Sequence, residues 1–302
     1  MRSQTIGPAN LRPCRTLTSY NSLSEILRYL IKTLVRESNH WHAHASAIIR
    51  VVRLKLPNFV DLANWEWEVE SKAEWKLAKV HWQNFYAKWY GAMETSLVDP
   101  NLSPSLSLES LPDTFDPSIS SSSTIFIRGS YVTMFNTVWV RSVATKGRKG
   151  VIITGQPGTG KTLFNYYLLV RLLQLKQVVL FSPDGDVVYL FYGNEVFTVG
   201  MGVLASQGID VPLPRPISRS SNVFIWTLFD IRDTKGPAKF LTAYPCFPVQ
   251  TASPNPVRYA TWEKERFALL TGLPLWSREE LAQGYVLPIT YFCPCLSAYY
   301  PG

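Results

Sequence analysis

From about Ile125 onward, short apolar runs alternate with longer stretches of helical periodicity, the pattern of a parallel sheet covered by helices. Strands are predicted at residues 151–154, 178–181, 223–229 and 247–251. Helices are predicted at residues 131–145, 162–175 and 258–270. The sequence therefore predicts an α/β domain with a mainly parallel sheet flanked by helices.

Two local signals add detail to this domain. A Pro-Asp-Gly-Asp turn at 183–186 and a Gly-Asn turn at 193–194 bracket two short apolar runs, which predicts an inserted hairpin. Ser277 and Glu280 have the spacing of a capping box, so a last short helix is expected to begin there.

Composition divides the whole chain into five segments. Residues 1–60 are a basic segment, partly helical or flexible, with an amphipathic helix expected at 22–36. A Trp-rich helical segment follows at 61–102, and a Ser- and Pro-rich linker at 103–124. The α/β domain occupies 125–287, and an irregular tail occupies 288–302.

Trp75, Trp82 and Trp89 recur every seven residues, which predicts an aromatic stripe along one helix. Such a stripe can stack nucleic-acid bases or pack against another domain. Base-stacking surfaces carry interleaved Lys or Arg, whereas the lysines here are balanced by nearby glutamates. Packing is the favoured interpretation.

The net charge of +8 is concentrated at the start of the chain, where residues 1–60 hold nine Lys or Arg against two acids. This segment is interpreted either as a solvated arm or as a contact for nucleic acid or a membrane surface. Four cysteines without a disulfide pattern favour an intracellular protein of the cytoplasm or nucleus. The acid-free first 24 residues also have the composition of a mitochondrial transit peptide. Apolar runs stay short of the roughly 20 residues needed for a membrane span.

The residues with the clearest chemistry read Gly-Gln-Pro-Gly-Thr-Gly-Lys-Thr at 155–162, between a predicted strand and a predicted helix. This is a complete phosphate-binding P-loop. Glycines allow successive N–H groups to turn toward one anion, and the positive end of the helix dipole faces the same point. Lys161 is expected to contact the outer phosphates and Thr162 to coordinate Mg²⁺. The expected nucleotide contacts are Gly155, Gln156, Pro157, Gly158, Thr159, Gly160, Lys161, Thr162 and Leu163.

Asp230 is the candidate second magnesium ligand, because it ends the apolar run 223–229 as such a carboxylate ends a buried strand. The alternative is a strand that happens to meet an Asp-containing turn. Ile231 directly follows Asp230, at the position where many P-loop proteins that hydrolyse their nucleotide have Glu. Asp233 is therefore the candidate for activating water, and slow or absent hydrolysis is the alternative.

Further polar residues are candidates for sensing the terminal phosphate or its charge. Ser253 and Asn255 follow the strand at 247–251, where a polar side chain can orient water, although an ordinary turn explains them equally well. Arg128 and Tyr131 precede the loop and either flank a base or start a helix. The candidate charge-stabilising arginines are Arg258, Arg266 and Arg278. No guanine-reading Asn-Lys-x-Asp motif occurs, so ATP is favoured over GTP.

The P-loop and three later stretches, within 225–231, 250–259 and 273–281, resemble the NTPase module of fungal Crinkler-type and retrotransposon-hot-spot-like proteins. The resemblance covers about 125–281 and implies an additional-strand P-loop ATPase core. It assigns phosphate and magnesium roles to Lys161, Thr162 and Asp230, and phosphate sensing to Ser253 or Asn255. Such modules continue into a helical region, whereas residues 288–302 have no helical pattern, as a truncated end would explain.

Three functions are compatible with these patterns. The leading hypothesis is an Mg²⁺-dependent ATPase whose cycle drives a conformational change. The alternatives are a nucleotide-binding switch or scaffold with little hydrolysis, and a truncated effector-like protein that contacts nucleic acid through its basic N-terminus. Expected partners are a nucleoside triphosphate and either another protein or further copies of the chain.

Overall fold

The structure, a computed structural model, describes residues 65–67, 74–92, 105–107, 124–216, 223–230 and 236–286. All of these belong to the unit Asn58–Gly302. The basic segment 1–60 with its expected helix, the tail 288–302 and the Ile231–Asp233 stretch named above lie outside the described residues.

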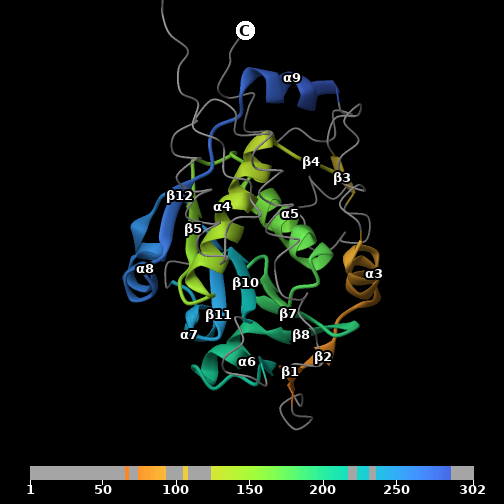
Figure 1. Cartoon of the computed structure of the whole chain (residues 1–302), viewed down its shortest axis with the longest axis vertical. Helices are drawn as coiled ribbons and strands as arrows, with labels where there is room; N and C mark the ends of the chain where they lie inside the picture. The colour runs from red at the N-terminus through yellow and green to blue at the C-terminus, as the bar shows by residue number, and fades with distance from the viewer. Residues whose placement is uncertain are drawn as a thin grey trace, which may run out of the picture. The chain divides into compact units, whose positions relative to one another are not determined.

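Strands from the predicted α/β domain form the centre of the described part. Five run parallel: β5 (Val151–Thr154), β6 (Val179–Ser182), β10 (Ile225–Asp230), β11 (Cys246–Thr251) and β12 (Leu269–Gly272). Three are antiparallel: β2 (Lys76–Leu77), β7 (Val187–Tyr192) and β8 (Glu195–Gly200). Their order in the sheet is β12-β5-β11-β10-β6-β7-β8-β2 (Figure 1). The predicted α/β class with a mainly parallel sheet is confirmed at this level.

Helices cover both faces of the sheet. One face carries α3 (Val80–Trp89), α4 (Gly129–Thr145) and α5 (Lys161–Gln174), and the other carries α6 (Met201–Ser206), α7 (Lys239–Thr242) and α8 (Ala260–Arg266). Side chains of β10 alternate between the two cores, as strand geometry requires. Trp226 and Leu228 face α4 and α5, whereas Ile225 and Phe229 face α7 and α8. Figure 1 shows α4 and α5 in front of the parallel strands.

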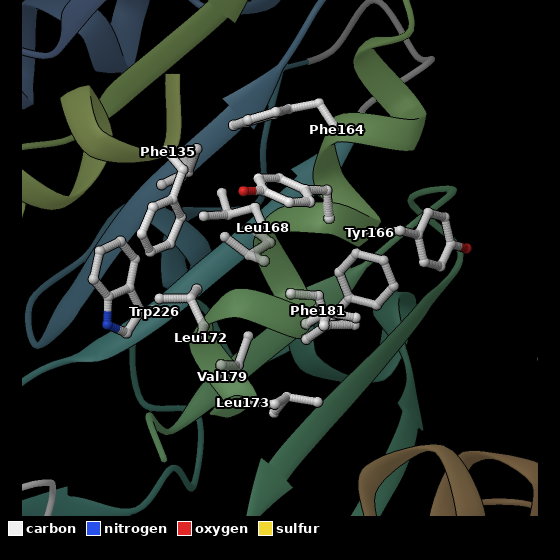
Figure 2. Packing of buried hydrophobic residues seen from close by; sticks show 14 of the residues in the cluster. Phe135, Phe164, Tyr166, Leu168, Leu172, Leu173, Val179, Phe181 and Trp226 are labelled. Carbon is white, nitrogen blue, oxygen red and sulfur yellow. The ribbon is translucent and has the colours of Figure 1, made fainter. Parts of the chain in front are cut away.

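Helix α5 is buried on nearly all sides because other elements surround it. Its residues from Phe164 to Gln174 are all buried. In Figure 2, Leu168 and Leu172 of this helix lie among Phe135 of α4 and Trp226 of β10. A helix buried all round is typical of a core position rather than a surface one. Its first residue, Lys161, is thereby held in a fixed place at the edge of the sheet.

Two local predictions are confirmed. Strands β7 and β8 form the inserted hairpin, with Tyr192 paired to Glu195 across the turn, and the hairpin extends the sheet through β6. Helix α9 (Arg278–Val286) begins with the predicted capping box: the Ser277 N–H donates to Glu280 Oε2 (3.0 Å), and the Glu280 N–H donates to Ser277 Oγ (3.1 Å).

The predicted tryptophan stripe is wrong at its first position. Trp75 precedes helix α3, and its indole N–H donates to the carbonyl of Pro212 (3.2 Å). The next residues form β2, which pairs with β8 at the end of the sheet. Trp82 and Trp89 do lie on α3 and are buried, with Trp82 4.2 Å from the ring of Tyr189. The seven-residue spacing of tryptophans cannot show that the residues just before the helix pair with the sheet as a strand.

The helix predicted at 258–270 is shorter than expected. The 3₁₀ turn η5 (Pro256–Arg258) precedes α8, which ends at Arg266 because Phe267 adopts a left-handed conformation, φ 47°. Residues 269–272 then form β12 beside β5. The apolar pair Leu269 and Leu270 suits a helix or a strand equally well, and the available edge of β5 decides the outcome.

Part of the predicted linker is also regular. Ser105–Ser107 forms β3, which pairs antiparallel with β4 (Thr124–Phe126). A separate two-stranded pairing joins β1 (Trp65–Glu66) to β9 (Arg215–Pro216). No helix in the described part of the chain is long and apolar enough to cross a membrane.

Candidate functional site

The glycine-rich loop connects the carboxyl end of β5 to the first residue of α5. Parallel strands bring their carboxyl ends to one edge of a sheet, where ligands bind in open α/β folds. Gly158 and Gly160 have φ values of 81° and 85°, which side chains rarely adopt. A Cβ atom at Gly160 would also collide with the hydroxyl of Tyr131. The loop conformation therefore depends on glycine at these two positions.

Lys161 lies at the start of α5 with its side chain folded over the loop. Its ammonium group donates to the carbonyl oxygens of Gly155 (2.7 Å) and Gln156 (2.9 Å). Burial lowers the pKa of Lys161, and the carboxylate of Asp230 partly opposes that shift. The ammonium group is therefore held beside the helix N-terminus, where a second positive feature, the helix dipole, also favours an anion.

Thr162 and Asp230 come together although 68 residues separate them. The Thr162 hydroxyl donates to Asp230 Oδ2 (3.1 Å), and both side chains are half-buried. Asp230 ends β10 on the same face of the sheet as Trp226 and Leu228, the face that α5 covers. A hydroxyl and a carboxylate oxygen are the hard oxygen donors that Mg²⁺ prefers. The pair fits the two protein ligands of a magnesium ion that keeps the rest of its shell for water and phosphate.

The remaining loop residues differ in exposure. Gln156, Pro157 and Gly158 are exposed, whereas Thr159 is buried with its hydroxyl donating to the Gln156 carbonyl (3.0 Å). Leu163 is half-buried and packs on the core beneath the loop. The loop thus presents backbone rather than large side chains to solvent.

The phosphate-sensing candidates follow β11, whose last residue Thr251 is in register with Asp230. Asn255 caps η5, because its Oδ1 accepts from the Val257 N–H (3.2 Å). Arg258 closes the same turn, and Arg278 is exposed at the start of α9. Asp233 lies outside the described residues.

Arg266 is at the opposite end of the sheet from the loop. Its guanidinium donates to the carbonyls of Thr242 (2.7 Å) and Cys246 (2.8 Å), and Cys246 begins β11, the strand that reaches the site only at its other end. Arg266 therefore joins structural elements and does not reach the loop of its own chain.

Two polar features at the site were not predicted. Asn165, one turn along α5 from Thr162, donates to the hydroxyl of Thr251 (3.0 Å) in the buried layer under the loop. Arg128, expected beside a base or at a helix start, is fully buried and donates to the Thr159 carbonyl (2.7 Å). The sequence showed that Arg128 lies next to a predicted helix. It could not show either hydrogen bond, because both join segments that are far apart in the sequence.

In the described ranges, no group of three or more His, Cys, Asp or Glu side chains could hold a metal ion. A cation held by Thr162 and Asp230 would need its further ligands from other groups, such as phosphate and water.

The chain is 30% identical over 143 residues to Crinkler effector protein 15 and, equally, to Crinkler effector protein 16, both from Phytophthora infestans. Each match covers 44% of this chain but 20% of the relative, so the chain matches about a fifth of the length of these relatives. They come from an oomycete, not from a fungus as the sequence resemblance suggested. No family model and no solved structure matches the chain. The protein is thus similar to Crinkler effectors over part of its length.

Proposed function

We propose that the protein binds Mg²⁺–ATP at residues 155–162 and hydrolyses it to drive a conformational change. The observation that carries this proposal is the 3.1 Å contact between Thr162 and Asp230 at the carboxyl edge of a parallel sheet. The contact brings a carboxylate from β10 to the first turn of the helix that follows the glycine-rich loop. The contact joins the two residues that a magnesium-dependent site requires.

The sheet order supports the same proposal. Strand β11 lies between β5, which precedes the loop, and β10, which ends at Asp230. This inserted strand fits the additional-strand class of P-loop ATPases that the sequence resembles. The similarity to Crinkler effectors is compatible with this proposal, although the names of these relatives describe no nucleotide chemistry.

Each residue has a distinct task in the proposed reaction. The loop N–H groups and the N-terminus of α5 bind phosphate oxygens, and Lys161 exchanges its carbonyl partners for the outer phosphates. Thr162 and Asp230 would hold the magnesium ion, and the ion would supply positive charge to offset the negative charge of the phosphate oxygens. Asp233 is assigned to the attacking water and Asn255 to its orientation.

A nucleotide-dependent switch with little turnover is the second candidate. It is favoured by Ile231, which directly follows Asp230 and cannot act as a base. Both candidates require nucleotide binding, and they differ only in hydrolysis.

Phosphate release from ATP by the purified full chain distinguishes the two candidates. For the ATPase, Asp230→Ala is expected to lower turnover by about 100-fold or more, because one protein ligand of the metal is lost, and Asp233→Ala by roughly 100-fold through loss of the base. Asp210→Ala, which removes an exposed carboxylate after α6, is the matched control and is expected to keep wild-type turnover. Turnover that is unchanged in Asp230→Ala would refute the assigned metal site. Binding without turnover in the wild type would establish the switch.

A further inference from the structure

Three side chains from outside the glycine-rich loop bind three consecutive carbonyl groups of that loop. Trp276 Nε1 donates to the Gly158 carbonyl (2.9 Å), Arg128 Nη1 to the Thr159 carbonyl (2.7 Å), and the Tyr131 hydroxyl to the Gly160 carbonyl (2.8 Å). Arg128 and Tyr131 flank the start of α4, and Trp276 precedes α9. We call these three residues the loop brace.

The brace helps to fix which way the loop N–H groups point, together with the Phe164 N–H of α5, which also donates to the Gly160 carbonyl (2.9 Å). In a trans peptide the carbonyl of one residue and the N–H of the next point to opposite sides. Holding the Thr159 and Gly160 carbonyls against the brace therefore directs the N–H groups of Gly160 and Lys161 away from it. Those are N–H groups that an anion at the N-terminus of α5 would use. The loop is thus oriented before any ligand arrives.

Arg128 is the centre of the brace and is fully buried. Its Nε and Nη2 donate to Glu280 Oε2 (3.2 and 2.9 Å), and Nη2 also donates to the carbonyls of Pro274 (3.1 Å) and Leu275 (2.8 Å). The ring of Trp276 lies 4.3 Å from the guanidinium carbon. A buried guanidinium is tolerated only when paired and hydrogen-bonded in this way. The same charge therefore connects the loop carbonyl to the segment that leads into α9.

The segment before α9 makes two further contacts around the loop. The Leu273 N–H donates to the carbonyl of Thr154, the last residue of β5 (2.7 Å), and Trp276 stacks on Phe126 of β4 at 6.1 Å between ring centroids. Burial raises the pKa of Tyr131, so its hydroxyl keeps the proton that it donates to Gly160. Figure 1 shows α9 beyond the ends of α4 and α5.

We propose that Arg128, Tyr131 and Trp276 are positioning residues that pre-orient the loop for phosphate, and that Glu280 couples loop occupancy to the docking of α9. The coupling rests on the proposed nucleotide binding, whereas the orientation of the loop does not. Because such coupling is reciprocal, a bound nucleotide stabilises the docked α9, and a docked α9 raises nucleotide affinity.

The first arm of the test uses the nucleotide-free full chain. Trp276→Phe keeps an aromatic ring against Arg128 but removes the donor to Gly158. Hydrogen–deuterium exchange of peptides covering residues 155–163 is expected to accelerate roughly 5-fold, the effect of losing one hydrogen bond. Trp75→Phe removes a similar indole-to-carbonyl bond away from the loop and is the matched control. Exchange that is equal in Trp276→Phe and the wild type would overturn the brace whether or not the protein binds nucleotide.

The second arm tests the coupling by titration with a slowly hydrolysed ATP analogue and Mg²⁺. Glu280→Gln keeps the capping box but removes the charge that pairs with Arg128, and affinity is expected to fall about tenfold. Glu279→Gln, on the neighbouring exposed side chain, is expected to bind as the wild type does. In the wild type, the analogue is expected to slow exchange in residues 278–286. Wild-type binding with unchanged affinity in Glu280→Gln would refute the coupling alone. No binding by the wild type would refute the proposed function and the coupling together, while the first arm still decides the brace.

Discussion

Lys161 is held at the start of α5 by contacts with the loop that it follows. Its ammonium group donates hydrogen bonds to two carbonyl oxygens of the loop, at 2.7 and 2.9 Å. In the proposed complex a phosphate would replace those contacts, because a charge-assisted bond to phosphate is stronger than one to a neutral carbonyl. The ammonium group of Lys161 is therefore held beside the loop by hydrogen bonds and does not extend into solvent.

The lowered pKa of Lys161 predicts that nucleotide affinity falls as the pH rises. Below that pKa the side chain is charged and attracts phosphate, and the attraction disappears as the pH rises through it. In Lys161→Arg the charge persists at alkaline pH, so affinity is expected to be weaker at neutral pH but nearly independent of pH above it. Titrations from neutral to alkaline pH check this. Parallel pH profiles for the two proteins would show that Lys161 does not carry the dependence.

At the scale of single elements, the position of the site depends on the buried helix α5. Leu168 lies in the middle of that helix and is fully buried between the sheet and α4. Its contacts hold the helix in place under the loop (Figure 2).

Leu168→Ala is expected to lower the free energy of unfolding by about 2–5 kcal/mol, through lost burial and the cavity that remains. Leu275→Ala removes the same atoms from a side chain that is 67% exposed, and a change within about 0.5 kcal/mol is expected. Chemical denaturation of both variants measures the difference. Equal destabilisation would mean that α5 is not packed as described.

The elements also show what the sequence could and could not predict. Apolar runs such as 151–154 and the turn at Gly193 predicted strands and the hairpin correctly, because their signals are local. Leu269 and Leu270 were mistaken for helix and Trp75 was placed on one, because pairing with β5 and β8 is a non-local effect. At the site, the loop was recognisable from its spacing. The brace was not, because Arg128 meets Glu280 across 152 residues.

At the scale of the whole molecule, three distant parts of the chain meet at one place. The loop itself, the end of β10 and the segment before α9 all lie at the carboxyl edge of the parallel strands. In the proposed function, these contacts would couple phosphate binding to the docking of α9. The basic segment 1–60 lies outside the described residues, so the proposed nucleic-acid contact through it rests on its charge alone.

Calorimetric titration of the full chain with a slowly hydrolysed ATP analogue, with and without Mg²⁺, tests the central claim most directly. Binding is expected to depend on Mg²⁺ and to be lost in Lys161→Ala. Lys264→Ala, which changes an exposed lysine of α8, is the control and is expected to bind as the wild type does. Absence of binding by well-folded wild-type protein, or equal binding by Lys161→Ala, would contradict the central claim.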